Sequence, residues 1–357
     1  MHINPIIESK AELTEASSGS LPIVISSRIR LARNLSQFFF PGWANSSQRD
    51  EVLATCLNAI GRMDSMKNGT RLEMAELTEL EKQILVERHL ISRELQHKSP
   101  ESGVYISSDQ SCSIMINEED HLRIQKVRRG MHFSELWQEI NPIDSYLEKE
   151  LDFAFSDDFG YLTACPTNLG TGIRASAMLH LPGLVIADHM EKVVRTVNHL
   201  GIAVRGLFGE GSEATGSLFQ ISNQQTLGES ESHIIDRLTK VLDAIIEQEQ
   251  NAREKLLEDS PAMIRDKLSR AAGILKSAYL LNSEESMSML SLLRLAVDLH
   301  FLPEHFRCVI DRFFIETQPG HVQYQCGKAT GPQQRDEWRA TQMRNAFASL
   351  PSLDFNK

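Results

Sequence analysis

Cysteine is scarce in this chain, and the few cysteines present are not paired. The 357 residues include five cysteines, an odd number, and none lies in a Cys-x-x-Cys pair. A disulfide framework or a structural zinc site is therefore not expected. No run of about 18 apolar residues is present, so no transmembrane helix is expected. The polar first 20 residues lack the apolar segment of a signal peptide, which makes the cytoplasm the expected compartment.

Clusters of basic residues are missing as well. The formal net charge is -11, and lysine and arginine do not gather in a long run. A role centred on nucleic-acid binding is therefore not expected. An acidic surface suits basic partners, but many proteins are acidic for solubility alone, so the charge balance decides little about function. The length of the chain favours two structural units.

The pattern of elements favours an α+β fold followed by helices. Short strands that do not alternate regularly with helices favour a mainly antiparallel sheet. The expected strands are 23–31, 104–106, 113–116, 161–165, 202–208 and 218–221. The expected helices are 47–62, one opened by a capping box at Thr78 and Glu81, 133–151 with a break at Asn141-Pro142, 173–181, 189–200, 232–257, 261–281, 283–301, 304–315 and 333–348. We expect a flexible lead-in at 1–20, a strand-rich domain at 21–255 and a helical domain at 256–357.

Every standard phosphate-binding loop is missing. The chain has no GxxxxGK[ST], no GxGxxG after a strand and no protein-kinase signature set. If it binds a nucleotide, guanidinium groups are the best remaining candidates, because each is permanently charged and offers a fork of donors. The candidates are Arg28, Arg30, Arg123, Arg174 and Arg205. A single arginine is more often a surface or salt-bridging residue, so the hypothesis depends on the whole set.

Two acidic segments accompany these arginines. Glu118-Glu119-Asp120 precedes Arg123, and Glu210 lies between two glycines. Pattern alone leaves a solvated turn and a tight glycine turn as alternatives. If the segment from 117 to 125 is extended, Glu119, His121 and Arg123 share one face. Arg174 is expected in the first turn of a helix, where backbone N–H groups favour anions.

Three segments together resemble the phosphagen kinase superfamily, in that family's order. They are SSRIRLARN at 26–34, NEEDHLR at 117–123 and CPTNLGTGIR at 165–174. The stretch 21–255 resembles the family's catalytic domain, which implies a glutamine-synthetase-like fold with a mainly antiparallel sheet flanked by helices. Within the superfamily the chain is most similar to the bacterial protein arginine kinases, through 86–92, 174–182, 205–214 and the RDEWRA segment at 335–340.

The resemblance implies an ATP-dependent kinase that phosphorylates a guanidinium nitrogen of arginine residues in proteins. Glu119 and Glu210 match the two catalytic carboxylates, which orient the acceptor while one takes its proton; which of them is the base stays open. Magnesium is expected to arrive with ATP, so no protein metal site is expected. The positions that match nucleotide-binding residues are Ser26, Ser27, Arg28, Ile29, Arg30, His89, Arg123, Arg174, Ala175, Ser176, Ala177, Met178, Arg205, Gly206, Leu207, Phe208, Gly209 and Glu210.

Two further features, the RDxxRA segment and Cys165, each allow two interpretations. The RDxxRA resemblance implies an allosteric phosphoarginine site at Arg335, Asp336, Arg339 and Ala340, in which the two arginines share a helix face. Pattern alone favours a solvated face with an Asp336–Arg339 pair. Cys165 lies near the matched arginines and is either a reactive thiol or a small buried residue.

Two other functions also stay open: a metabolic kinase of free arginine, and a non-catalytic phosphoarginine-binding adaptor. Only 22 residues precede Ile23, whereas metabolic arginine and creatine kinases carry a helical domain there, so a more open acceptor site is expected. The resemblance further implies arginine-containing protein substrates, heat-shock regulation, an activator protein, a Clp protease system and a homodimer. Nucleic acid and membrane are not expected partners.

Overall fold

The computed structural model describes residues 3–8, 23–206, 215–327 and 330–355. The chain divides into two compact units. Unit 1 comprises Met1–Leu13, Ser26–Ala177 and Ser222–Lys240, and unit 2 comprises Thr14–Ile25, Met178–Ile221 and Val241–Lys357. No helix within the described ranges is long and apolar enough to cross a membrane. The domain boundary expected at residue 255 stays a prediction.

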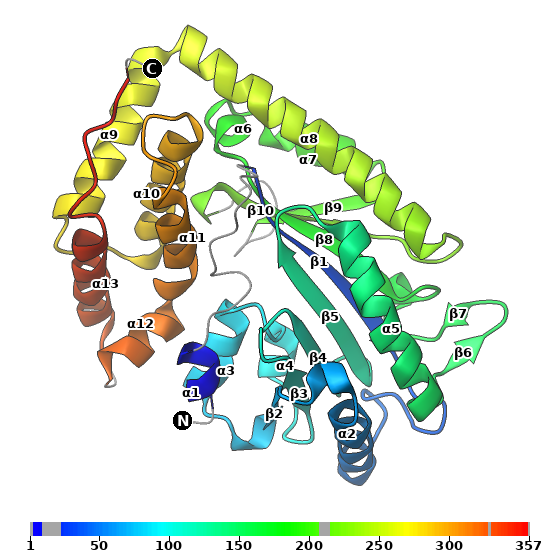
Figure 1. Ribbon diagram of the computed structural model, residues 1–357. Helices are drawn as coiled ribbons and strands as arrows, with labels where there is room; N and C mark the ends of the chain where they lie inside the picture. Colours follow the sequence, from blue (N-terminus) through cyan, green and yellow to red (C-terminus); the bar gives the residue numbers. More distant parts are fainter. Residues whose placement is uncertain (1–2, 9–22, 207–214, 328–329, 356–357) are drawn as a thin grey trace. The chain divides into compact units, whose positions relative to one another are not determined.

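One mainly antiparallel sheet carries the strand-rich part of the chain. In the described ranges its strand order is β2-β3-β4-β5-β1-β8-β10-β9 (Figure 1). Every pairing from β2 to β1 is antiparallel, as the sequence predicts. The strands are β1 (Val24–Arg33), β2 (Thr70–Glu73), β3 (Gly103–Ile106), β4 (Cys112–Ile116), β5 (Leu122–Arg129), β8 (Ile173–His180), β9 (Ile202–Gly206) and β10 (Leu218–Asn223). A separate hairpin pairs β6 (Phe155–Ser156) with β7 (Gly160–Tyr161).

Helices of unit 1 cover part of this sheet. They are α1 (Asn4–Glu8), α2 (Ser46–Gly61), α3 (Glu79–Glu87), α4 (Arg93–Gln96) and α5 (Phe133–Leu151), with 3-10 turns η1 (Asp64–Met66), η2 (Met74–Glu76) and η3 (Pro166–Asn168). Helices α2 and α5 pack on each other, α2 also on β3 and β4, and α5 on β5. The predicted capping box at Thr78 and Glu81 is present at the start of α3.

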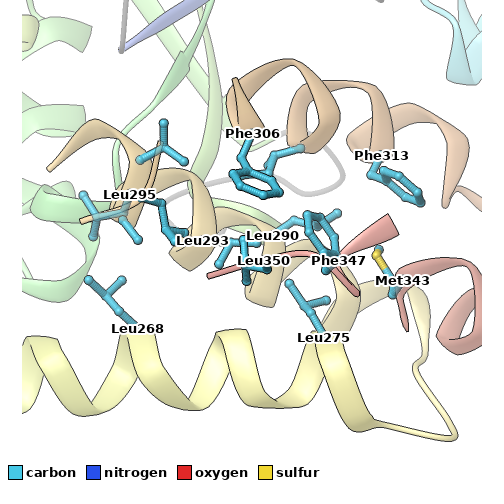
Figure 2. Packing of buried hydrophobic residues seen from close by; sticks show 14 of the residues in the cluster. Leu268, Leu275, Leu290, Leu293, Leu295, Phe306, Phe313, Met343, Phe347 and Leu350 are labelled. Carbon is cyan, nitrogen blue, oxygen red and sulfur yellow. The ribbon is translucent and has the colours of Figure 1, made fainter. Parts of the chain in front are cut away.

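Unit 2 is built around helices, as expected for the C-terminal part. They are α6 (Pro182–Ile186), α7 (Met190–Asn198), α9 (Pro261–Ser277), α10 (Ser283–Asp298), α11 (Phe306–Glu316), α12 (Pro319–Cys326) and α13 (Pro332–Ala346), with the 3-10 turn η4 (Thr215–Ser217). Helix α8 (Glu231–Asp259) begins in unit 1 and ends in unit 2. Leucines of α9 and α10 meet Phe306, Phe313 and Phe347 in one core (Figure 2). Burying each such side chain contributes roughly 1.5–3 kcal/mol.

The helix predicted at 173–181 is wrong, because these residues form strand β8. Alanine, methionine and leucine favour a helix in isolation. Here the segment lies between β1 and β10, where it is mostly buried and its backbone groups pair with neighbouring strands. Arg174 therefore lies on a strand and not at a helix N-terminus.

Other predicted elements also differ. Pro142 lies inside an unbroken α5, whose buried stripe holds the helix together despite the missing N–H. The strand expected at 161–165 is reduced to β7, since Pro166 opens a 3-10 turn. Helix α12 was not expected, and the lead-in expected at 1–20 contains α1. Strand β5 begins only at Leu122, so the shared face expected for Glu119, His121 and Arg123 does not form.

A buried network of charges lies among the helices of unit 2. The fully buried Asp298 accepts from Arg253 Nη1 at 2.9 Å and from Arg294 Nη1 at 3.5 Å, and it also pairs with Arg307. Arg294 Nε donates to Asp311 at 2.8 Å. The three arginines lie on α8, α10 and α11, so one carboxylate ties three helices together.

Strand β8 is tied to the same network at its end. Glu249 accepts from the backbone N–H groups of Gly183 and Leu184 at 2.8 Å and from Arg253 Nε at 2.6 Å. His180 pairs with Ser291 Oγ at 2.8 Å. Burial and the neighbouring arginines hold the pKa of His180 well below its usual range, so this imidazole is neutral.

We predict that Asp298→Ala destabilises the protein by about 3–5 kcal/mol, because it leaves buried arginines without their shared carboxylate. Chemical denaturation followed by circular dichroism measures the change. Glu191→Ala is the matched control, since its pair with Arg195 is solvent-exposed and contributes little. Equal stability of the two variants would contradict a structural role for the network.

Candidate functional site

Arginines from three adjacent strands lie together in the middle of the sheet. Arg28 and Arg30 lie two residues apart on β1, opposite Val127 and Gln125 of β5, and Arg123 lies further along β5. Arg174 lies on β8, the neighbour of β1 on its other side. All of these arginine side chains are partly buried. The structure therefore brings together four of the five arginines that the sequence singled out.

These guanidinium groups repel one another. Burial, Arg174 and Arg123 lower the pKa of Arg28 to about 10. Burial together with Arg28, Arg123 and Arg174 lowers the pKa of Arg30 well below its usual range, and Glu118 offsets this in part. The buried Nε of Arg30 has no hydrogen-bond partner among the described residues. Within the described ranges Glu118 is the carboxylate that offsets the charge on Arg30, and such a concentration of positive charge suits a polyanion such as the phosphates of ATP.

The acidic run forms the turn between β4 and β5. Glu118 is fully buried and accepts from Arg123 Nη1 at 2.7 Å, from the N–H of Glu119 at 3.0 Å and from the hydroxyl of Ser92. Glu119 is 44% exposed and accepts from Arg123 Nη2 at 3.2 Å. The turn therefore holds Arg123 with one buried carboxylate and leaves the second carboxylate accessible.

Side chains on either side of the turn fix its position. Asp120 Oδ1 accepts from Asn34 Nδ2 and from the N–H of Ala164, each at 2.7 Å. The Nδ1 atom of His121 accepts from the N–H of Leu35 at 3.0 Å, so its Nε2 carries the proton and donates to the Phe39 carbonyl. Burial lowers the pKa of His121 to about 4, which keeps it neutral. The acidic turn is thus tied to the end of β1 and to the segment that leads to Cys165.

His89 belongs to the arginine cluster. Burial, then Arg28 and Arg93, lower the pKa of His89 to about 4, so the ring adds no further positive charge. Its backbone adopts φ +60°, and its carbonyl accepts from Gln125 Nε2 at 2.6 Å.

Cys165 is partly exposed, and its Sγ lies 3.0 Å from Thr167 Oγ1. The interpretation of Cys165 as a small buried residue is therefore wrong, while its reactivity stays a prediction.

The other predicted nucleotide-binding positions are distributed along three strands. Ser26, Ser27 and Ile29 lie on β1, Ala175, Ser176, Ala177 and Met178 lie on β8, and Arg205 and Gly206 lie on β9. Ile29 and Ala175 are fully buried, whereas Arg205 is exposed. Leu207, Phe208, Gly209 and Glu210 lie outside the described residues. The role of the second predicted carboxylate therefore stays a prediction.

The RDxxRA segment lies on α13 in unit 2. Arg339 is buried, and it donates to the carbonyls of Thr317 at 2.9 Å and Leu281 at 2.7 Å and to Asp336 Oδ1 at 2.7 Å. Arg335 Nη1 donates to the Thr330 carbonyl at 2.8 Å. Ala340 is fully buried. The expected Asp336–Arg339 pair exists, but the solvated face is wrong, because Arg339 fastens α13 to two neighbouring segments. Arg339 also lines a small cavity with Phe313, Glu316, Thr317, Val322, Gln325 and Gln342.

Comparison with known proteins gives the family. Residues 51–252 match the model of the ATP:guanido phosphotransferase C-terminal catalytic domain, and residues 261–357 match that of the protein-arginine kinase McsB C-terminal domain. The chain is 44% identical over 340 residues to a protein-arginine kinase of Pelotomaculum thermopropionicum, and the match covers 94% of this chain and 96% of the relative. A protein-arginine kinase of Brevibacillus brevis is 45% identical over 335 residues, and that match covers 93% of this chain and 94% of the relative. The chain belongs to the protein-arginine kinase family of ATP:guanido phosphotransferases. The resemblance read from the sequence is thereby confirmed.

Solved structures support the fold. The duplicated taurocyamine kinase of Schistosoma mansoni, with transition-state-analogue components bound, superposes with a TM-score of 0.58 at 24% identity, over 68% of this chain and 35% of that chain. A lombricine kinase gives the same TM-score and identity over 70% of this chain and 72% of that chain. At this identity the likeness shows a shared phosphagen-kinase fold.

Sequence reasoning missed the role of Arg33, which belongs to the same β1 motif as Arg28 and Arg30. Arg33 Nε and Nη2 donate to the two oxygens of Asp144 at 3.0 and 2.7 Å, and its guanidinium group lies 3.6 Å from the centre of the Tyr161 ring. The sequence did contain a signal for this difference. Odd and even positions of a strand face opposite sides, so Arg33 faces away from Arg28 and Arg30. This kinase therefore uses arginines of one strand for two purposes, a charged cluster on one face and a buried ion pair on the other.

We predict opposite effects on stability for Arg30→Gln and Arg33→Gln. Arg30→Gln removes a repelled, partly buried cation, so the unfolding midpoint of the ATP-free protein rises. It also lowers kcat/KM for ATP by at least about 100-fold, the usual loss when one preorganised charge donor is removed. Arg33→Gln breaks a buried pair and lowers stability by about 3–5 kcal/mol.

Thermal unfolding with and without Mg-ATP measures both variants. Stabilisation by ATP is expected to disappear in Arg30→Gln and to persist in Arg33→Gln, because only a ligand that binds the folded state raises the midpoint. A fall in midpoint for ATP-free Arg30→Gln would show that Arg30 is a structural residue.

Proposed function

We propose that this kinase transfers the γ-phosphoryl group of ATP to a guanidinium nitrogen of arginine residues in proteins. One observation carries the proposal: a cluster of mutually repelling arginines lies beside a half-exposed carboxylate, Glu119. The arginine cluster suits a polyanionic phosphate donor, and Glu119 suits a cationic acceptor. The names of the relatives support the same reaction and a protein acceptor.

The arginine cluster would hold the phosphates of ATP. Arg28, Arg30, Arg123 and Arg174 supply charge that stabilises the transferring phosphoryl group, which is the main requirement of phosphoryl transfer. The Nε of Arg30 has no hydrogen-bond partner in the part of the chain that the structure describes, so it would suit a phosphate oxygen. Magnesium would reach the site on ATP, where it bridges phosphate oxygens and needs few protein ligands. In the described ranges no group of three or more His, Cys, Asp or Glu is placed to hold a metal ion.

Glu119 would hold the acceptor together with Glu210. The guanidinium group of arginine has a very high pKa, so it is normally protonated and then a poor nucleophile. Two carboxylates can fix its planar fork, aim one nitrogen at the γ-phosphorus and take the proton as the N–P bond forms. Glu119 already accepts from the guanidinium group of Arg123, so its geometry suits this contact.

We predict that Glu119→Gln lowers kcat for protein phosphorylation by at least about 100-fold, because the amide can neither balance the acceptor charge nor take its proton. The assay is mass spectrometry, without acid treatment, of a protein acceptor incubated with the kinase and Mg-ATP. Glu191→Gln, a change at an exposed glutamate on α7, is the control. Wild-type-like activity of Glu119→Gln would contradict the proposed role of Glu119 in holding the acceptor.

The same assay separates the alternatives. A protein kinase phosphorylates an arginine-rich protein far better than free arginine, whereas a metabolic kinase shows the reverse. A non-catalytic adaptor transfers no phosphate to either acceptor. Transfer to free arginine alone would overturn the proposed acceptor and leave the phosphoryl chemistry in place.

The RDxxRA segment is proposed as an allosteric phosphoarginine site. Arg339 supports the fold through carbonyl contacts, so Arg335 is the sharper test. Arg335→Ala is expected to weaken binding of free phosphoarginine at least about tenfold, since a charge-assisted contact is lost, while the unfolding midpoint stays within error. Isothermal titration calorimetry measures the binding. Undiminished affinity would remove Arg335 from the site.

An activator protein, a Clp protease system and a homodimer are proposed from family resemblance. Heat-shock regulation has the same basis.

A further inference from the structure

Two segments beside the acidic turn expose large aromatic side chains. The first joins β1 to α2 and carries Phe39, 65% exposed, and Trp43, 88% exposed. The second is the β6–β7 hairpin, which carries Phe155 and Phe159, 56% and 52% exposed. An exposed apolar patch rimmed by polar residues is typical of an interaction surface, whereas single exposed apolar residues are normal. We call these two segments the aromatic arms.

The arms are anchored, so their exposure is built into the fold. In the first arm, the rings of Phe38 and Phe40 lie edge-on to the buried ring of His121, and Phe39 between them is left outside. The Phe39 carbonyl accepts from His121 Nε2 at 3.0 Å. The N–H of Trp43 donates to the Phe40 carbonyl at 2.8 Å, which closes a turn. The local structure therefore presents Phe39 and Trp43 to solvent.

The second arm is joined to the same place. Leu35 pairs with Phe153, and the N–H of Ser36 donates to the carbonyl of Asp152 at 3.0 Å. Asn34 contacts both Asp120 and the Leu162 carbonyl just beyond the hairpin. Figure 1 shows the hairpin and the segment after β1 at the same end of β1. Asn34, where the first arm begins, and Ala164, just beyond the second arm, thus both donate to Asp120 in the turn that carries Glu119.

The charge around the arms is negative. Asp157 and Asp158 are exposed between Phe155 and Phe159 at the tip of the hairpin, and Asp152 is exposed at its base. Glu119 adds an accessible carboxylate. A surface of aromatic rings and carboxylates suits a partner that offers both apolar side chains and arginine.

We propose that the aromatic arms bind the polypeptide on either side of the acceptor arginine, and that they select arginines flanked by apolar residues. The partner is an extended segment of a protein, because an extended chain can present side chains on both sides of one arginine to two separate arms. A second copy of this chain fits less well, since a self-paired interface would bring the acidic hairpin tips together. The inference rests on the proposed function and names its substrate class.

Two synthetic peptides test the proposal. Each has one central arginine, flanked in one case by leucine and phenylalanine and in the other by glycine and serine. The wild-type kinase is expected to phosphorylate the apolar peptide with at least about tenfold higher kcat/KM, mainly through a lower KM. The double variant Phe39→Ser, Trp43→Ser is expected to lose this preference, while KM for ATP and kcat at saturating peptide stay within about twofold.

Controls separate docking from other effects. Phe155→Ser, Phe159→Ser tests the second arm in the same way, and Tyr279→Ser removes a 79% exposed aromatic residue that belongs to neither arm. Tyr279→Ser should keep the wild-type preference. Unfolding midpoints within error of wild type show that each variant is folded.

Three outcomes would overturn the proposal. In the first, the wild type phosphorylates both peptides equally. In the second, the arm variants keep the preference. In the third, light scattering shows that the variants change the oligomeric state but not the preference, so the arms bind a second copy. If the wild type phosphorylates neither the peptides nor any protein, the proposed function fails instead.

Discussion

The repulsion among guanidinium groups on β5, β1 and β8 is the constraint on which the site depends. Placing Arg28, Arg30, Arg123 and Arg174 together, partly out of water, opposes folding, as the lowered pKa of Arg28 and Arg30 records. Such a cluster persists only where interactions elsewhere in the fold outweigh its cost. Here the surroundings are the antiparallel pairing of β1 with β5 and the buried ion pair of Arg33 with Asp144 on the opposite face. The proposed polyanion site is therefore held in place by a strand pairing and an ion pair that form without the polyanion.

Arginines elsewhere in the chain show the contrast. Arg253, Arg294 and Arg307 are also buried, but they converge on Asp298, with Glu249 and Asp311 nearby. That network balances its charge internally and therefore serves the fold. In the arginine cluster of unit 1, the carboxylates that offset the charge within the described ranges are those of the acidic turn. The difference in charge balance, and not the residue type, separates the arginines proposed to bind ATP from the structural ones.

Much of this organisation could be predicted from the sequence. Strand β1, the capping box of α3, the antiparallel sheet, most C-terminal helices and the arginine set follow from alternation, spacing and missing phosphate loops. Strand β8 could not be predicted, because its alanine-rich sequence favours a helix until β1 and β10 provide partners. The burial of Glu118 and Arg339 was also out of reach, because each depends on partners far along the chain, Ser92 for one and Thr317 and Leu281 for the other. Local pattern specified which residues carry charge, whereas tertiary contacts decided which of them remain accessible.

Arg123 connects the two halves of the proposed reaction. Glu118 holds it at 2.7 Å and is itself buried and fixed by Ser92 and the N–H of Glu119. Glu119 holds it at 3.2 Å from a half-exposed position, so this contact is the longer and more accessible of the two. An acceptor arginine presents the same planar fork as Arg123. Glu119 therefore already meets, in the resting protein, the group that it would bind in the substrate. A carboxylate positioned in advance by its neighbours needs little reorganisation when the acceptor arrives, which is the condition for electrostatic stabilisation of the transferring group.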